Sequence, residues 1–377
     1  MFTDRLKTEL TVTSPGRINI IGEHTDYNNG YVLPAAIDKT IIFKLGRNHT
    51  ETLCRIYSEG FGEMVEIHLD SITKKTSGWE NHMLGVLHEI IQITDKLKGF
   101  DCSIKSHLPV GSGVSSSAAL ECGLAFGLNE LFDLGLDSWD IIKLSQKAEH
   151  EFVGTKCGIM DQFASVMGKK DHVMLLDCMT FDYEYIPMDI APYQILLLNT
   201  NVAHNLASSE YNIRRSQCEK GLEILQKKFG ARISFRDVTQ SMLDDCKDEM
   251  GEIIHQRCFY VIDENKRVFQ AVEALKQHDL LQFGQLLYQT HEGLRHDYEV
   301  SCPELDFLVD FSKDRKEVLG ARMMGGGFGG CTLNIIHKNA IADFVKDATR
   351  AYQNEFSREL TYFQTVPSDG TTIIRKK

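Results

Sequence analysis

One stretch constrains the fold more than any other, because small residues there run directly into a helix-forming segment. It begins with Gly111, Ser112 and Gly113 and continues through three serines into an apolar run from Ala118 to Phe132. Glycines let a backbone approach a ligand closely. A loop that leads into a helix N-terminus gathers unpaired N–H groups and the positive end of the helix dipole. The stretch predicts a phosphate-binding loop, with a plain Gly/Ser turn and a serine N-cap as the structural alternative.

Two well-known phosphate-binding loops do not match this stretch. A Walker loop requires a lysine after its second invariant glycine, and no lysine follows here. A dinucleotide-binding fingerprint requires a buried strand after the helix, ending in an acidic residue. The segment 133–137, which follows the helix, is too short and polar to be that strand. The rest of the chain must therefore identify the loop.

Composition places the chain among globular proteins with room for two domains. It has 377 residues, of which 42% are hydrophobic and 25% charged. The formal net charge of −12 argues against nucleic acid or an anionic membrane as a partner. The texture changes near residues 198–205, where long charged amphipathic segments begin. We therefore predict two domains, spanning residues 1–200 and 201–377.

Cysteine usage and the N-terminus bear on the cellular compartment. None of the ten cysteines form a C-x-x-C pair, so a zinc or redox site is not predicted. Residues 1–5 lack the apolar core of a signal peptide, and no apolar run approaches membrane-spanning length. We expect a reducing, cytoplasmic location.

Hydrophobic periodicity gives a coarse secondary-structure prediction. Ser138 is expected to cap a helix that runs to about Phe152. The region 230–252 is polar and predicted to be loop-rich. Other predicted helices span residues 79–95, 208–228 and 262–297, a short helix follows Gly158, and predicted strands include 101–108, 172–177 and 193–199.

Two other segments carry polar groups suited to a ligand. Glu23, His24 and Asp26 lie close to Arg17, and such mixed donors and acceptors suit the hydroxyls of a polyol. Their spacing fits no zinc pattern, and a solvated turn is the structural alternative. The six residues 325–330 include five glycines before an expected strand, which predicts a hairpin that lets main chain approach a ligand.

Two acidic residues have both structural and catalytic interpretations. Asp161 falls in the first turn of the predicted helix after Gly158, where a carboxylate is favoured by the dipole. It is either a helix-start carboxylate or a group that activates or orients a hydroxyl nucleophile. Glu149, on the preceding helix, is either a surface carboxylate or an Mg²⁺ ligand.

Together these segments resemble the GHMP family of small-molecule kinases over nearly the whole chain. The first of them is similar to a signature that only the galactose-type members of the family share. Val114, where leucine is usual, and Ser112, where alanine is common, are small departures from the phosphate loop. The matching segments are Ser14–Asn28, Gly111–Leu120, Gly158–Phe163, Leu206–Tyr211, Asp297–Leu305 and Gly325–Cys331.

The resemblance implies a fold and an activity. The fold would be α+β with two lobes, an N-terminal ribosomal-protein-S5-domain-2-like lobe and a C-terminal ferredoxin-like lobe, and the active site between them. The activity would be ATP-dependent phosphorylation of the C1 hydroxyl of α-D-galactose, giving galactose 1-phosphate and ADP. This is the first committed step of galactose catabolism in the Leloir pathway. A monomer using ATP and Mg²⁺ is expected.

The resemblance also implies residue roles. Asp161 would face the C1 hydroxyl, as a base or as an orienting group, and Arg17 would lie beside it and the transferring phosphoryl group. Ser117 and Glu149 would hold Mg²⁺, and Trp79 would border the adenine. The ATP phosphates would contact Gly111, Ser112, Gly113, Val114, Ser115, Ser116 and Ser117. The sugar would contact Arg17, Glu23, His24, Thr25, Asp26, Gly158, Asp161 and Tyr211.

Two alternatives stay open at this point. The first is a kinase of the same family for another sugar, such as N-acetylgalactosamine or arabinose. The second is a catalytically silent sensor that binds sugar and ATP and signals through a protein partner. Such sensors have a damaged serine-alanine stretch in the phosphate loop, whereas residues 115–119 here read Ser-Ser-Ser-Ala-Ala.

Overall fold

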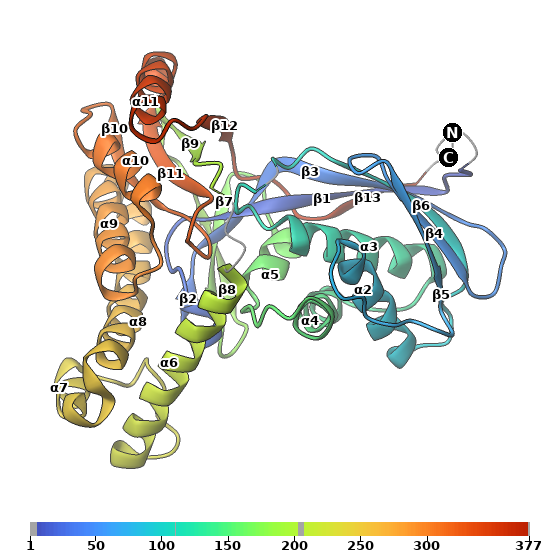
Figure 1. Ribbon diagram of the computed structural model, residues 1–377, viewed down its shortest axis with the longest axis horizontal. Coiled ribbons are helices and arrows are strands. Elements are labelled where there is room, and N and C mark those ends of the chain that lie inside the picture. The colour runs from blue at the N-terminus through green and yellow to red at the C-terminus, as the bar shows by residue number, and fades with distance from the viewer. Residues whose placement is uncertain (1–5, 110, 203–206, 376–377) are drawn as a thin grey trace.

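The computed structural model describes residues 6–109, 111–202 and 207–375 (Figure 1). Residues 1–5, on which the signal-peptide prediction depends, lie outside this range, and so does Leu206 of one matched segment. The described residues form three β-sheets and the helices packed on them. Among the described residues, no helix is long and apolar enough to cross a membrane.

The largest sheet has six strands, covered on one face by four helices (Figure 1). In sheet order the strands are β13 (Thr372–Arg375), β1 (Leu10–Asn19), β3 (Pro34–Arg47), β6 (Phe100–Ser106), β4 (Leu53–Ser58) and β5 (Glu63–His68). The four helices are α2 (Glu80–Ile93), α3 (Ser116–Phe132), α4 (Ser138–Ala148) and α5 (Met160–Met167). All strand pairs are antiparallel except β4 and β6.

Close packing of α3 on this sheet fixes the position of the Gly/Ser loop. A Cβ atom at Gly123 would lie 2.2 Å from Cε2 of Phe43, so only glycine allows this approach of α3 to β3. The apolar run that predicted the helix is buried along most of its length. The loop before α3 is thereby held at one end of the sheet.

A second sheet carries the glycine hairpin. Its four strands, in order, are β10 (Val318–Met323), β11 (Cys331–His337), β9 (Tyr193–Asn199) and β12 (Thr361–Thr365). Residues 324–330 join β10 to its antiparallel neighbour β11, as the sequence predicted. A third sheet contains β2 (Tyr31–Val32), β7 (His172–Asp177) and β8 (Tyr183–Pro187). The division at residue 200 stays a prediction, and strand pairing crosses it, because β13 joins β1.

The later helices lie on the other side of the molecule (Figure 1). They are α6 (Ala207–Phe229), α7 (Gln240–Asp244), α8 (Lys247–Lys276), α9 (Leu280–Glu292), α10 (Pro303–Lys313) and α11 (Ile341–Phe356). Buried Glu264 of α8 anchors these helices to the first of the matched segments, Ser14–Asn28, which we call the first motif. It accepts hydrogen bonds from the Gly22 backbone at 2.8 Å, the Thr290 hydroxyl at 2.9 Å and the Arg267 guanidinium at 2.7 Å.

The predicted single helix over 262–297 is wrong. α8 ends at Lys276, His278 takes a left-handed conformation with φ 56°, and Asp279 caps α9 by accepting from the backbone N–H of Gln282. The loop-rich prediction for 230–252 is also wrong in part. α7 lies within that region, and α8 already begins there. The Asp279 and Thr239 side chains cap the starts of α9 and α7, and apolar periodicity does not register such caps.

The predicted cap at Ser138 is wrong by one residue. Asp137 is the N-cap of α4, and its carboxylate accepts from the Asp140 backbone N–H at 2.8 Å. The Asp140 carboxylate accepts in turn from the Asp137 N–H at 3.0 Å. This reciprocal capping box satisfies two donors at the helix start.

Candidate active site

Arg17 and Asp161 form the centre of the candidate site, although they are far apart in sequence. Arg17 lies on β1 and Asp161 in the first turn of α5, as expected for a helix-start carboxylate. The guanidinium donates to the two carboxylate oxygens, from Nε at 2.7 Å and from Nη2 at 3.0 Å. Its Nη1 donates to the Gly113 carbonyl at 2.5 Å. One buried arginine thus fixes a carboxylate beside the Gly/Ser loop in bidentate geometry.

Ser115 connects the start of α3 to the same carboxylate. It occupies the N-cap position in a left-handed conformation, with φ 54° and ψ 54°, which is uncommon for a residue other than glycine. Its hydroxyl donates to Oδ2 of Asp161 and makes no capping hydrogen bond. The alternative of a serine N-cap does not hold at this position.

A pocket of about 250 Å³ lies over the start of α3, and all seven loop residues predicted to contact phosphate line it. Its lining consists of Arg17, Pro109, Gly111, Ser112, Gly113, Val114, Ser115, Ser116, Ser117 and Gly326. The helix N-terminus favours an anion there through its free N–H groups and its dipole. We call this space the loop pocket.

A second pocket, also of about 250 Å³, includes Arg17 in its lining. It is lined by Arg17, Glu23, His24, Asp26, Glu149, Thr155, Cys157, Met160, Asp161, Tyr211, Gly325 and Gly326. We call it the acidic pocket, because four carboxylates line it. The two pockets share Arg17 and Gly326, so an anion in one would lie next to a ligand in the other.

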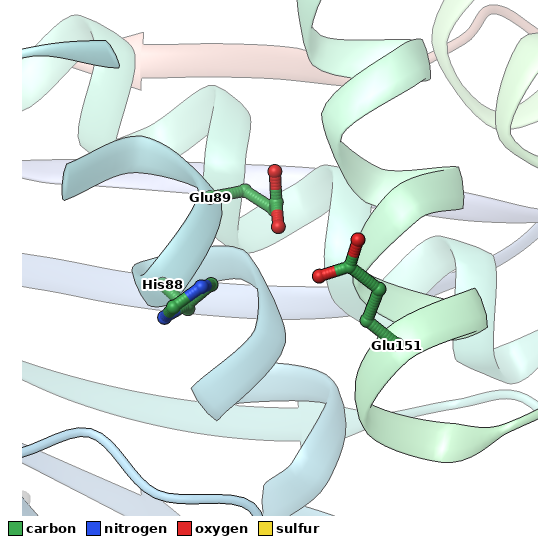
Figure 2. Close-up of side chains that lie close together, drawn as sticks. All are labelled: His88, Glu89 and Glu151. Atoms are coloured by element: carbon green, nitrogen blue, oxygen red, sulfur yellow. The ribbon is translucent and has the colours of Figure 1, made fainter. Parts of the chain in front are cut away.

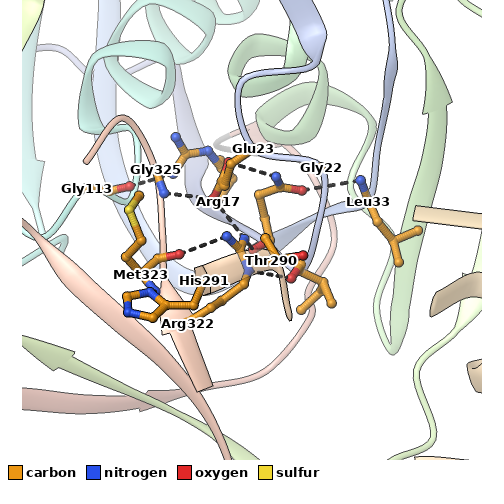
Figure 3. A network of polar contacts seen from close by, with 12 residues as sticks. Arg17, Gly22, Glu23, Leu33, Gly113, Thr290, His291, Arg322, Met323 and Gly325 are labelled. Atoms are coloured by element: carbon orange, nitrogen blue, oxygen red, sulfur yellow. Dashed lines mark hydrogen bonds and ion pairs between the residues drawn. The ribbon is translucent and has the colours of Figure 1, made fainter. Parts of the chain in front are cut away.

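Glu23 lies at the centre of a buried polar network (Figure 3). Its Oε1 accepts from Arg322 Nη2 and from the Gly325 backbone N–H, each at 2.8 Å. Its Oε2 accepts from Asn19 Nδ2 at 2.8 Å. Burial would raise the pKa of Glu23, but Arg322 and Arg17 hold it below its usual value. Glu23 therefore stays ionised and joins the first motif to the glycine hairpin.

Asp26 and His24 have pKa values displaced by burial. Burial raises the pKa of Asp26 to about 7, and the nearby Asp161 carboxylate adds to this rise. Burial lowers the pKa of His24 to about 4, against the attraction of Glu23. His24 is therefore a neutral imidazole at neutral pH, and its backbone is left-handed with φ 62°.

Glu149 lies at the start of a π-helical turn, Glu149–Val153, that continues α4. Its Oε2 accepts from Gln162 Nε2 at 2.9 Å. Burial raises the pKa of Glu149 to about 8, and Glu121 adds to the rise, whereas a hydrogen bond from Ser117 opposes it. Among the described residues, no lysine or arginine forms an ion pair with Glu149.

Three predicted site residues do not line either pocket. The Thr25 hydroxyl lies 2.8 Å from the carbonyl of Gly22 and 2.7 Å from that of Tyr31, so it supports its own loop. Gly158 lies behind Asp26, where a Cβ atom would be 2.0 Å from Asp26 Oδ2. Trp79 stacks on Phe61, with ring centroids 5.7 Å apart, and its indole nitrogen has no partner in the described part of the chain.

Sequence reasoning missed several polar residues behind the site. Arg322 is fully buried and donates to Glu23 and to the backbone carbonyl of Ile20. Glu121 is fully buried and lies 2.7 Å from His82 Nδ1. A signal was available for Arg322 and Glu121, because each is a charged residue inside an apolar segment. Such residues are seldom fully buried unless they are paired.

A separate cluster of possible metal ligands lies outside both pockets (Figure 2). His88 and Glu89 of α2 and Glu151 of the π-helical turn have ligand atoms within 4.8 Å of one another. Lys147 Nζ lies 2.9 Å from Glu89 Oε2 and 3.8 Å from Glu151 Oε1. The ammonium group already supplies the positive charge, so we assign no metal to this cluster.

Three family models match the chain. The GHMP kinases N terminal domain matches residues 81–169, and the GHMP kinases C terminal domain matches residues 271–354. The galactokinase galactose-binding signature matches residues 1–47. Fold and site together define a small-molecule kinase of the GHMP type, which confirms the predicted fold class.

Relatives and solved structures narrow this class. Galactokinase of Thermosipho africanus is 42% identical over 366 residues, which cover 97% of this chain and 100% of the relative. Galactokinase of Thermotoga maritima is 41% identical over 365 residues, with coverage of 97% and 100%. The chain therefore belongs to the galactokinase family.

The structural comparisons agree with this assignment. The crystal structure of Lactococcus lactis galactokinase complexed with galactose superimposes with a TM-score of 0.92 at 34% identity, covering 97% of this chain and 95% of that one. The Methanococcus jannaschii mevalonate kinase structure has a TM-score of 0.67 at 18% identity, covering 96% and 99%, and shares the fold.

Proposed function

We propose that this protein transfers the γ-phosphoryl group of ATP to the C1 hydroxyl of α-D-galactose, releasing galactose 1-phosphate and ADP. The observation that carries the proposal is the position of Arg17, which lines both pockets and holds Asp161 in bidentate geometry. ATP phosphates in the loop pocket and a sugar in the acidic pocket would meet at this arginine. The reaction would be the first committed step of galactose catabolism. Action as a cytoplasmic monomer is part of the same proposal.

Phosphoryl transfer depends on positioning and on stabilising charge at the transferring group. In the proposed site, the N–H groups at the start of α3 bind the phosphates, and Arg17 stabilises charge on the transferring group. Asp161 faces the C1 hydroxyl and either accepts its proton or orients it. Its contacts with Arg17 and Ser115 fix the carboxylate before substrate binds.

The residues expected to hold Mg²⁺ fit that ion. Ser117 supplies a hydroxyl oxygen and Glu149 a carboxylate, which are the hard oxygen ligands that Mg²⁺ prefers. Glu149 is buried beside other carboxylates and has no lysine or arginine partner among the described residues. A cation bound next to it would therefore stabilise its ionised form. When bound, the ion would neutralise charge on the phosphates.

The sugar would be held by the groups that line the acidic pocket. Glu23, His24, Asp26 and Tyr211 supply acceptors and donors around the space. In the proposed complex, Thr25 and Gly158 act indirectly, since one supports the loop and the other leaves room for Asp26. Trp79 would border the adenine from outside the loop pocket.

ADP release, measured with Mg-ATP across a panel of sugars, tests the proposal. The panel includes galactose, N-acetylgalactosamine and arabinose. Release with galactose is expected to be lost in Asp161→Ala, while calorimetry still detects galactose binding. Release only with another sugar would reassign the substrate. Galactose binding without release from any sugar would indicate a sensor. Near-wild-type turnover in Asp161→Asn would exclude both roles of Asp161.

A further inference from the structure

A line of hydrogen-bonding side chains runs from the core of the later helices to the acidic pocket. His24 Nδ1 lies 2.8 Å from the Tyr27 hydroxyl, which lies 2.8 Å from the Tyr298 hydroxyl. The Tyr298 hydroxyl lies 3.2 Å from the sulfur of Cys218. Tyr298 and Cys218 have no exposed surface. Nothing in the proposed chemistry uses Tyr27, Tyr298 or Cys218.

The other end of this line is His24, which borders the acidic pocket and is 3% exposed. Its Nε2 makes no hydrogen bond among the described residues, although the Gly326 backbone lies close to the ring. The rings of Tyr27, Tyr211 and Tyr298 surround the imidazole, with centroids 5.0 to 5.8 Å away. The backbone of His24 is held in a left-handed conformation. A strained, enclosed residue with one unpaired polar atom points to a ligand contact.

The direction of the hydrogen bonds follows from their partners. Asn28 donates to the His24 carbonyl at 2.8 Å and so holds the backbone of this residue. At the far end of the line, the Cys218 thiol carries an S–H group that can donate to the Tyr298 hydroxyl. Tyr298 then donates to Tyr27, and Tyr27 donates to His24 Nδ1. The Tyr27 hydroxyl donates to His24 because an imidazole nitrogen is a better hydrogen-bond acceptor than a phenol oxygen.

This direction leaves the one imidazole proton on Nε2. The neutral state of His24, which follows from burial, means that the ring carries no second proton. His24 lines the acidic pocket together with the carboxylates of Glu23, Asp26, Glu149 and Asp161. Carboxylates accept hydrogen bonds, whereas a sugar hydroxyl both donates and accepts. A donor is what such a pocket needs to bind the oxygen of that hydroxyl.

We infer that Tyr27 and Tyr298 are positioning residues that fix His24 in the Nε2–H tautomer, so that it donates to one hydroxyl of the sugar. The inference rests on the proposed function and adds to it a determinant of sugar specificity. Cys218 closes the line of hydrogen bonds at its far end.

The tautomer can be measured directly. Two-bond ¹H–¹⁵N correlation spectra of the whole protein at pH 7.5 distinguish the two neutral forms, and His24→Gln assigns the His24 signals. We expect the Nε2–H pattern in the wild type without sugar. In Tyr27→Phe we expect the pattern to shift toward a mixture, because Nδ1 has lost its donor. An Nδ1–H pattern in the wild type overturns the inference.

Galactose binding tests the consequence. By calorimetry, Tyr27→Phe is expected to weaken galactose binding about 3- to 10-fold, the range for one hydrogen bond. Tyr298→Phe is expected to act in the same direction but less, since Tyr27 keeps its own proton. The double variant should bind no worse than Tyr27→Phe, because the groups act in series. KM for ATP should not change.

Controls separate this role from loss of structure. Tyr352→Phe removes another buried hydroxyl, which donates to the Thr200 carbonyl at 2.8 Å, and should leave galactose binding unchanged. Among monodeoxygalactoses, the one lacking the contacted hydroxyl should be insensitive to Tyr27→Phe. Additive losses, or equal sensitivity of every sugar, would contradict the inference. Absence of ADP release with galactose overturns the proposed function, while the tautomer measurement still decides the inference.

Discussion

Two carboxylates of one loop, Glu23 and Asp26, have pKa values displaced in opposite directions. Both are buried. Glu23 accepts a hydrogen bond from Arg322, and its pKa is lowered. Burial raises the pKa of Asp26 to about 7, and the negative charge of Asp161 adds to the rise. Direct contact with a cation decides the outcome, because burial alone disfavours charge on either group.

The raised pKa predicts that Asp26 lowers the free energy of unfolding as the pH rises. Its folded-state pKa lies above the unfolded value of 3.8, so the folded state binds the proton more tightly. This contribution to stability is fully present below pH 3.8 and is lost as pH rises through about 7. Between pH 5 and pH 8, the free energy of unfolding of Asp26→Asn should rise by roughly 2–3 kcal/mol relative to that of the wild type. Urea unfolding of the protein without ligands measures this difference.

Asp177 provides the matched control. Burial opposes its ionisation, but hydrogen bonds from Arg236 and nearby backbone N–H groups lower its pKa to about 2. Both its folded and unfolded forms are ionised above pH 5, so Asp177→Asn should destabilise by a constant amount over that range. If the difference in the free energy of unfolding between Asp26→Asn and the wild type were also independent of pH, the pKa of Asp26 would not be raised.

At the scale of elements, helix α3 and its preceding loop couple stability to the site. Ser115 adopts a left-handed conformation that glycine takes at little cost and alanine at about 1–2 kcal/mol. Ser115→Gly should therefore be more stable than Ser115→Ala by about 1 kcal/mol. Both variants lack the hydroxyl that donates to Asp161, so their kcat values should fall by similar factors.

Thermal unfolding and ADP release measure the two effects separately. Equal stability of the glycine and alanine variants would mean that residue 115 leaves the left-handed conformation in solution. Wild-type kcat in both would remove the Ser115 hydroxyl from any role at Asp161.

Elements with strong apolar patterns were predictable, whereas a break between two consecutive helices was not. The predicted strands at 172–177 and 193–199 coincide with β7 and β9. The helix over 262–297 was wrong because its apolar stripe continues across the turn after Lys276. Only the left-handed His278 and the cap at Asp279 mark the break, and neither changes the hydrophobic period.

At the scale of the whole molecule, Arg322 joins β10 of one sheet to the first motif of another. It donates to the Ile20 carbonyl at 2.7 Å, the Met323 carbonyl at 2.8 Å and the Glu23 carboxylate at 2.8 Å (Figure 3). A lysine keeps the charge but cannot reproduce this planar fork. We expect Arg322→Lys to lower the free energy of unfolding by about 2–4 kcal/mol and to weaken galactose binding.

Urea unfolding followed by circular dichroism, with galactose titrations, tests this expectation. Arg350→Lys is the control, because the Arg350 side chain is 73% exposed and, within the described part of the chain, forms an ion pair only with Asp347 of α11. It should change stability by less than about 0.5 kcal/mol. Equal effects of the two substitutions would show that the buried fork contributes little.

The site itself was predictable only where its residues share a motif. Segments such as Glu23 to Asp26, or the Gly/Ser loop, present their chemistry within a few residues of sequence. The Glu23–Arg322 pair spans 299 positions, and no local pattern identifies such a partner. Its existence depends on how two sheets face each other, which hydrophobic periodicity does not specify.

The pairing of β13 with β1 bears on how the chain is made (Figure 1). β1 and β3 can pair early in synthesis, but β13 is made after every other described helix and strand. Until the ribosome releases it, the outer edge of β1 has unpaired backbone groups. Such edges template pairing with other chains. Products of stalled translation that lack β13 would therefore expose the β1 edge to pairing with other chains, whereas β13 covers that edge in the folded protein.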